Sequence, residues 1–166
     1  MPRPIARSCY AIAVGSNRRG RHGAPHAEVK AALDLLGGRA SPIVTSAPVG
    51  PSIRTFANAV TLVAIDGSPA DLLVRLKDIE RRFGRRAGRR WGSRVIDLDI
   101  ILWSGGRVDT RRLRIPHPLF ATRAFVLAPL LAVAPRWRDP RSGLTVRQLH
   151  ARLTRRRPVP SPRTSA

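Results

Sequence analysis

The chain has 166 residues, of which 43% are hydrophobic, so it can build one domain with a buried core but not two. Its 31 basic residues, only two of them lysines, outnumber 10 acidic residues and give a net charge of +21. Such a charge attracts polyanions: nucleic acid, an acidic membrane or a polyphosphate substrate. A single cysteine, Cys9, excludes an intrachain disulfide, and no apolar run approaches the roughly 20 residues that span a bilayer.

Hydrophobic periodicity and turn residues predict eight elements along the chain. They are a strand at 9–14, a helix at 27–36, strands at 42–49 and 56–65, a helix at 69–83, a strand at 95–103, and helices at 125–134 and 146–153. The clearest is the helix at 69–83, where Leu72, Leu76 and Ile79 share one face and Ser68 supplies the cap. This order predicts an α+β sandwich with helices packed on a mostly antiparallel sheet.

The domain boundaries follow from composition. We expect one domain over residues 9–154, an N-terminal extension over 1–8, and a disordered basic tail over 155–166. The apolar stretch near the N-terminus is short and ends in a glycine turn, which is a poor match to a signal peptide. We therefore expect a cytoplasmic protein.

Two acids on one strand carry the sharpest chemical signal. Alternation along the strand puts Asp97 and Asp99 on one face, about 6–7 Å apart, where they can bind a hard cation such as Mg²⁺. The alternative is a half-exposed strand whose polar face carries two acids by chance. Seven arginines lie just upstream, at positions 81, 82, 85, 86, 89, 90 and 94. Carboxylates that bind a metal beside mobile guanidiniums are what phosphoryl transfer requires, and nearby glycines would let the segment close as a lid.

Seven segments in chain order strengthen this interpretation: 11–17, 46–51, 56–60, 79–85, 90–99, 112–117 and 123–130. The most specific is Arg90-Trp91-Gly92-Ser93-Arg94-Val95-Ile96-Asp97-Leu98-Asp99. Together they resemble the 6-hydroxymethyl-7,8-dihydropterin pyrophosphokinase family of folate biosynthesis, over about residues 9–150. The resemblance implies a ferredoxin-like core and transfer of pyrophosphate from MgATP to the pterin hydroxymethyl group, with release of AMP.

The resemblance also implies a role for each matched residue. Asp97 and Asp99 would hold two Mg²⁺ ions, and Arg85 and Arg94 would be the catalytic guanidiniums. The implied contacts to ATP are Glu80, Trp91, Ile100, Arg112, His117 and Arg123. The implied contacts to the pterin are Ser46, Ala47, Val49, Phe56, Asn58 and Phe125. As partners we expect only these small molecules, with no obligatory nucleic acid and no membrane, and we expect a monomer.

The chain departs from the family pattern at several positions. Ser46-Ala47 stands where Thr-Pro is commoner, Phe56 where Tyr is often found, and Pro118 where an aromatic residue is frequent. The arginine-rich segment is one residue shorter than in some relatives, which affects the placement of Arg85. These departures bear on pterin affinity and lid kinetics rather than on the reaction.

Two rival functions remain to be weighed. A basic nucleic-acid-binding protein agrees with the net charge, but the chain has no helix-turn-helix, RNA-recognition or zinc signature. It would also leave the two acids unexplained. A nucleotidyltransferase also pairs Gly-Ser with Asp-x-Asp, but the two motifs lie close together in that class and about 80 residues apart here.

Overall fold

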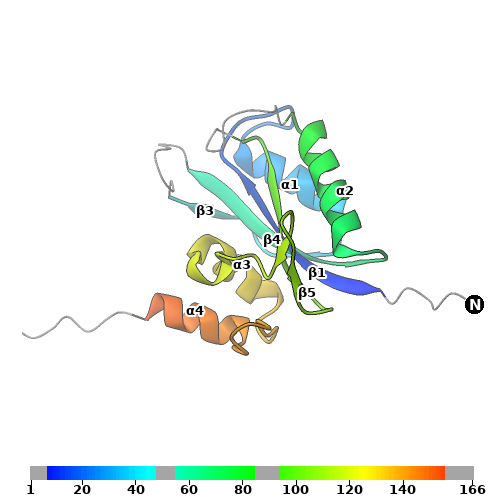
Figure 1. Cartoon of the computed structure of the whole chain (residues 1–166). Helices are drawn as coiled ribbons and strands as arrows, with labels where there is room; N and C mark the ends of the chain where they lie inside the picture. The colour runs from blue at the N-terminus through cyan, green and yellow to red at the C-terminus, as the bar shows by residue number, and fades with distance from the viewer. Residues whose placement is uncertain (1–6, 48–54, 85–93, 156–166) are drawn as a thin grey trace, which may run out of the picture.

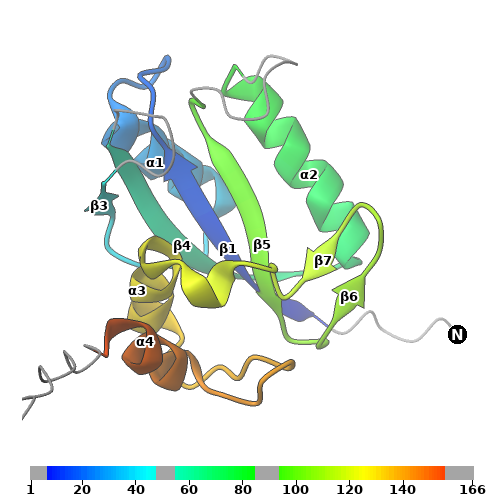
Figure 2. The same ribbon diagram turned by 60° about the vertical axis from the view of Figure 1, so that its left-hand side comes forward.

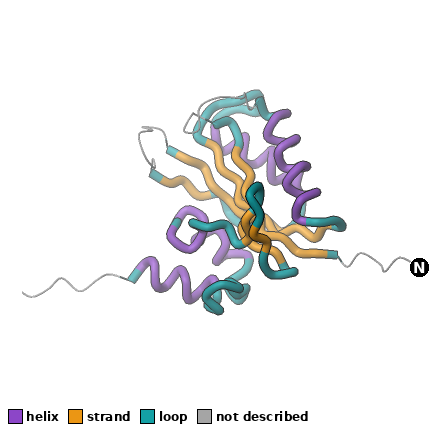
Figure 3. The backbone as a smooth tube through the Cα atoms, in the orientation of Figure 1, coloured by secondary structure: helices purple, strands orange, loops and turns teal. Residues whose placement is uncertain are grey.

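The computed structural model describes residues 7–47, 55–84 and 94–155. The strands are β1 (Ser8–Ser16), β2 (Arg39–Ala40), β3 (Val44–Ser46), β4 (Phe56–Ile65), β5 (Asp97–Trp103), β6 (Val108–Asp109) and β7 (Arg114–Ile115). The helices are α1 (Pro25–Leu36), α2 (Pro69–Arg82), α3 (Ala124–Val133) and α4 (Val146–Thr154), with a 3-10 turn at Phe120–Thr122. Strands and helices therefore alternate much as the sequence predicts, and Figure 3 shows them by type.

Among the described residues, five strands form one antiparallel sheet in the order β2-β4-β1-β5, with β3 also paired to β4. The two longest strands, β1 and β4, pair along the whole of β1, from Ser8 opposite Ile65 to Ser16 opposite Ala57. Strand β5 pairs with the other edge of β1. The first strand is thus the centre of the sheet, and its C-terminal end lies between β4 and the start of β5.

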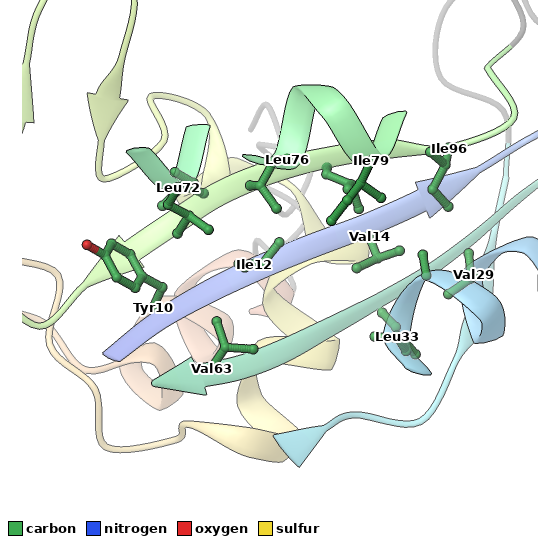
Figure 4. Packing of buried hydrophobic residues seen from close by; sticks show 14 of the residues in the cluster. Tyr10, Ile12, Val14, Val29, Leu33, Val63, Leu72, Leu76, Ile79 and Ile96 are labelled. Carbon is green, nitrogen blue, oxygen red and sulfur yellow. The ribbon is translucent and has the colours of Figure 1, made fainter. Parts of the chain in front are cut away.

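Alternation along β1 sends side chains into two separate cores. Tyr10, Ile12 and Val14 pack with Val29 and Leu33 of α1 and with apolar residues of α2 (Figure 4). Ala11, one residue out of step, packs on the opposite face with residues of α3 and α4. Helices α1 and α2 therefore cover one face of the sheet and α3 and α4 the other (Figures 1 and 2). This is the ferredoxin-like α+β sandwich.

Helix α2 shows how local sequence sets an element. The Ser68 side chain accepts a hydrogen bond from the Asp71 N–H, and the Asp71 carboxylate accepts one from the Ser68 N–H. This reciprocal cap satisfies donors at the helix start that would otherwise lack partners. Leu72, Leu76 and Ile79 are then buried against the sheet, so the helix lies beside β5 (Figure 2).

Strand β5 carries an irregularity after its acidic residues. Ala11 pairs with Leu102 but Ile12 pairs with Ile100, so Ile101 is an extra residue in the ladder. As a result Ile101 and Leu102 both belong to the core beneath α3. Up to Ile100 the alternation is regular, and Leu98 and Ile100 face α1 and α2.

The described helices include none long and apolar enough to cross a membrane.

Candidate active site

A row of side chains crosses the sheet on the face that α3 covers. Val60 is buried in the core beneath α3, so Asn58, two residues earlier on β4, faces the same way. Gly15 of β1 lies opposite Asn58 on one side and opposite Asp97 on the other. Residues opposite one another in an antiparallel sheet point to the same face. Asn58 and Asp97 therefore stand on one face, two strand spacings or about 10 Å apart.

The floor between these two side chains is backbone. Gly15 has no side chain, and a Cβ atom at this position would lie 3.3 Å from Asn58 Oδ1. In the next row Ala13 stands between Val60 and Asp99. Because Gly15 and Ala13 are small, no long side chain projects from β1 between the amide on β4 and the two carboxylates on β5. Such an open surface suits a flat ring.

Arg94 is fixed beside the first carboxylate. Its Nη1 lies 2.7 Å from Asp97 Oδ1. The backbone of Arg94 pairs with Asn17, whose Oδ1 accepts the Arg94 N–H at 2.9 Å and whose N–H donates to the Arg94 carbonyl at 3.3 Å. Asn17 directly follows β1, which includes Gly15 and Ser16, so the central strand holds this arginine in place.

The two acids lie on the predicted face, and the surroundings of Asp99 disfavour its charged form. Burial, and next the negative charge of Asp97, raise the pKa of Asp99 to about 6. The positive charges of Lys77 and Arg123 act in the opposite direction. A bound cation would offset the electrostatic cost of holding two carboxylates close together.

Glu80 supports the pair from beneath. Its side chain is fully buried, and Oε1 accepts the N–H of Leu98 at 2.9 Å. Lys77, one turn earlier on α2, lies 3.0 Å from Oε2 of Glu80. Because Leu98 stands between Asp97 and Asp99, Glu80 anchors the backbone that sets their spacing.

His117 and Arg123 approach the carboxylates from the α3 side. The His117 N–H donates to the carbonyl of Ile101, which ties this segment to β5. The Leu119 N–H donates to His117 Nδ1 at 3.2 Å, so a neutral imidazole carries its proton on Nε2. Burial and then the charge of Arg123 lower the pKa of His117, while Asp97 opposes the shift. His117 is therefore a neutral donor at neutral pH.

The residues predicted to contact the pterin gather at the β3–β4 end of the row. Asn58 Nδ2 donates to Ser46 Oγ at 2.8 Å, and Ser46 pairs with Phe56 in the ladder. Ala47 follows β3 and is exposed. Phe125, half-buried near the start of α3, lies beneath the Arg123 guanidinium at 5.7 Å from the ring centroid.

Other predicted residues lie elsewhere. The Ile100 side chain is 4% exposed and packs in the core beneath α1 and α2, so only its backbone can meet a ligand. Arg112 is exposed in the turn between β6 and β7, a hairpin beside β5 (Figure 2). Val49, Arg85 and Trp91 lie outside the described residues, as do most of the arginines of the expected lid.

Asp97 and Asp99 fit a magnesium site. Within the described ranges there is no cluster of three or more His, Cys, Asp or Glu side chains that could hold a metal by themselves. Mg²⁺ is usually held by one or two carboxylates, with water and substrate phosphates as its other ligands. Two oxygen-donor side chains whose charges repel each other match that requirement.

The raised pKa of Asp99 predicts a stability effect in the metal-free protein. An Asp in the unfolded chain has a pKa of about 3.9, so the folded state binds more protons between pH 4 and 6. Stability therefore falls as pH rises through this window. Asp99→Asn, which cannot ionise, is expected to be about 3 kcal/mol more stable than the wild type at pH 8. At pH 4 the two should be equal.

Urea denaturation in the presence of a chelator measures this difference. Asp34→Asn, which removes an exposed carboxylate paired with Lys30, serves as the matched control and should show no such gap. A variant at Asp99 that is less stable than the wild type at both pH values would contradict the assignment of a strained carboxylate.

Sequence reasoning missed the role of Asn17. The Gly-Ser-Asn turn by itself is a weak signal, because many strands end in such residues. The only local signal was an asparagine directly after a central strand. Its side-chain amide and its backbone N–H can both bind the backbone of another segment. Its contact with Arg94 joins residues 77 positions apart and is set by the fold.

Paired carboxylates, an arginine on one of them and a neutral imidazole nearby are the groups with which phosphoryl-transfer enzymes bind and activate a nucleotide. The sequence profile described as 7,8-dihydro-6-hydroxymethylpterin-pyrophosphokinase matches residues 11–135. The chain therefore belongs to this family.

Individual relatives agree with the family assignment. The chain is 38% identical over 137 residues to the 2-amino-4-hydroxy-6-hydroxymethyldihydropteridine pyrophosphokinase of Pseudomonas aeruginosa, covering 78% of this chain and 82% of that one. It is 41% identical over 111 residues to the Synechocystis protein of the same name, covering 67% of this chain and 57% of the relative. The crystal structure of a Plasmodium falciparum HPPK-DHPS has the same fold, with a TM-score of 0.70 at 14% identity. That match covers 91% of this chain and 45% of the other.

Proposed function

We propose that this chain transfers the pyrophosphoryl group of ATP to the hydroxymethyl group of 6-hydroxymethyl-7,8-dihydropterin and releases AMP. The observation that carries the proposal is the row Asn58–Gly15–Asp97. It sets an amide suited to a heterocycle and a carboxylate suited to a phosphate-bound cation on one surface. Membership of the family, whose relatives are named for this reaction, supports it.

Asp97 and Asp99 would hold two Mg²⁺ ions, which neutralise triphosphate oxygens when bound. Arg94, whose guanidinium is held by Asp97 and whose backbone is held by Asn17, would stabilise the charge of the group that moves. His117 would donate its Nε2 hydrogen to a phosphate oxygen, and Arg123 would add a positive charge beside it. Glu80 acts through the backbone of Leu98 rather than by touching nucleotide, since its side chain is fully buried.

The remaining implied contacts complete the nucleotide side of the proposal. The resemblance assigns Arg85 to the transferred group and Trp91 to the nucleotide. Arg112, exposed on the β6–β7 hairpin, and the backbone of Ile100 would meet the nucleotide along the outer edge of β5.

On the pterin side, Asn58 Oδ1 lies over Gly15, while its Nδ2 is bound to Ser46. A ring N–H of the pterin would donate to that oxygen, and Phe125 would stack on the ring. Ala47, Val49 and Phe56 would line the same end. The hydroxymethyl group then points along the row toward Asp97. Its oxygen attacks the β phosphorus and loses its proton to water, the bond from that phosphorus to the bridging α-phosphate oxygen breaks, and AMP leaves with that oxygen.

Asn58→Ala is expected to raise the KM for the pterin about tenfold, because a buried hydrogen-bond partner of the ring is lost. The dissociation constant of a fluorescent ATP analogue should stay within about twofold of the wild type. Ser46→Ala removes only the hydroxyl that accepts from Asn58 and should produce a smaller change in the same direction. Equal weakening of ATP and pterin would mean that Asn58 does not belong to the pterin half.

Partner and compartment follow from the same proposal. We propose a monomer that acts on small molecules in the cytoplasm, with every group of the two half-sites supplied by one chain. The rival function, nucleic-acid binding, predicts a salt-sensitive gel shift and no turnover.

The test of the proposed function is product analysis with both substrates. Incubation with MgATP and hydroxymethyl-dihydropterin should yield AMP in equal amount to pterin diphosphate, and neither substrate alone should yield AMP. Formation of ADP, or AMP formation that is independent of pterin, would overturn the proposal.

A further inference from the structure

Glu28 on α1 is a fully buried carboxylate that binds the loop between β1 and α1. Its Oε1 accepts the backbone N–H of His22 at 2.7 Å and that of Gly23 at 3.2 Å. Its Oε2 lies 2.8 Å from His22 Nδ1. An ionised carboxylate accepts from that nitrogen when Nδ1 carries the proton. Both oxygens of the Glu28 carboxylate therefore bind this one loop, which we call the residue 17–23 loop.

The same loop contacts the chain on both sides of the arginine-rich segment. The His22 ring packs on Phe83, at the C-terminal end of α2, with 4.8 Å between ring centroids. Gly20 packs so closely on Val95 that a Cβ atom would lie 2.4 Å from Val95 Cγ1. Asn17, at the start of the loop, binds the backbone of Arg94.

These contacts fix the position of the residue 17–23 loop between Glu28 and Val95. A side chain at Gly20 would also lie 2.5 Å from Glu28 Oε1, so the carboxylate and Val95 leave room there for backbone alone. Burying a carboxylate is costly unless its oxygens are hydrogen-bonded, and here the loop supplies those bonds. Glu28 is thereby linked to the backbone of Arg94 through Gly20, Val95 and Asn17.

We propose that Glu28 and His22 are positioning residues for Arg94: they set the residue 17–23 loop on which Arg94 and Val95 rest. This rests on the function proposed above, in which Arg94 acts at the transferred group. A small displacement of a transition-state donor lowers the chemical step more than it weakens binding. The effect of the pair should therefore appear in kcat and should require Arg94.

His22→Ala tests the proposal with least risk to the fold, because it keeps the backbone N–H and one third of the side chain is already exposed. It should lower kcat about tenfold and change the KM for pterin less than twofold. His26→Ala, an exposed histidine on α1, is the matched control and should leave both unchanged. Gly20→Ala, which pushes on Val95 from the other side, should reproduce the loss in kcat. If neither His22→Ala nor Gly20→Ala lowers kcat, the proposal is overturned.

A double mutant shows whether the effect passes through Arg94. If His22 acts only by positioning it, His22→Ala added to Arg94→Ala should change kcat less than twofold. A further tenfold loss in that background would overturn the proposal, because His22 would then act by another route.

The backbone amide NMR signal of Arg94 gives a readout that does not depend on turnover. It should shift in His22→Ala and stay in place in His26→Ala. If the wild type makes no AMP but this signal shifts, the proposed function fails and the coupling of the loop to Arg94 stands. If the wild type makes AMP, and His22→Ala does so at the same rate with the signal unmoved, the positioning role fails alone.

Discussion

Asp97→Ala and Asp99→Ala are each expected to lower kcat by about 10³-fold while the chain stays folded. Each change removes one of the two carboxylates that face the α3 side of the sheet and fit Mg²⁺. The fold should survive because these acids repel each other, and the pKa of Asp99 is raised by burial and by Asp97. Single-turnover kinetics, with circular dichroism to confirm folding, measures both parts of the expectation.

The control for this pair is Asp34→Ala, which removes an exposed acid bound only 2.5 Å from Lys30 on α1. It should leave kcat unchanged. Raising Mg²⁺ should restore part of the activity of the variants at 97 and 99, because the remaining carboxylate still binds the cation weakly. Turnover near the wild-type value at ordinary Mg²⁺ in either variant would remove the metal assignment.

Arg94→Ala is expected to lower kcat by about 10²–10³-fold with a smaller effect on the affinity for ATP. A donor aimed at charge that grows in the transition state contributes mainly to the chemical step. Arg94 is suited to this, since its side chain is one-third exposed, its guanidinium is held by Asp97 and its backbone is held by Asn17. Arg94→Lys should recover little, because an ammonium lacks the planar fork that binds two oxygens at once.

Arg82→Ala provides the comparison. Arg82 also pairs with an aspartate on its own segment, Asp78, at 2.8 Å, but on the exposed surface of α2. It should have no measurable effect on kcat. If Arg94→Ala instead loses ATP affinity by the same factor as kcat/KM, with an unchanged single-turnover rate, Arg94 is a binding residue only.

Much of the fold was predictable because its elements carry local signals. The spacing of Leu72, Leu76 and Ile79 after a serine cap predicts a helix from 69, and α2 begins at Pro69. The run of β-formers at 56–65 coincides with β4. Alternation in the acidic strand correctly places Leu98 and Ile100 on one face and the two acids on the other.

Other elements were wrong or absent in the prediction for physical reasons. Of the described part of the strand predicted over 42–49, only Val44–Ser46 is a strand (β3), and the preceding strand β2 (Arg39–Ala40) was not predicted. Ser41 lies between β2 and β3. Its N–H donates to the Val60 carbonyl of β4, and its hydroxyl donates to the Pro42 carbonyl and accepts the Val60 N–H. Strands β6 and β7 have two residues each, too few for any alternation to show.

The site was predictable as a set of residues and not as an arrangement. The strand register that puts Gly15 between Asn58 and Asp97 depends on pairing across 40 to 80 residues of sequence, which no local pattern encodes. The burial of Glu80 and the Ile100 side chain depends likewise on how α2 packs against β5. Tertiary packing thus buries the side chains of two residues that the sequence predicts to contact ATP.

The fate of the β phosphorus of ATP shows directly which bond breaks. With ATP labelled at that atom, the enzyme, Mg²⁺ and hydroxymethyl-dihydropterin, the label should move to the pterin together with the γ-phosphate and leave unlabelled AMP. This outcome requires attack at the β phosphorus, which the site of Asp97, Asp99 and Arg94 is proposed to support. Label that stays in ADP, with only the γ-phosphate on the pterin, would instead mean attack at the γ phosphorus and rule out pyrophosphoryl transfer.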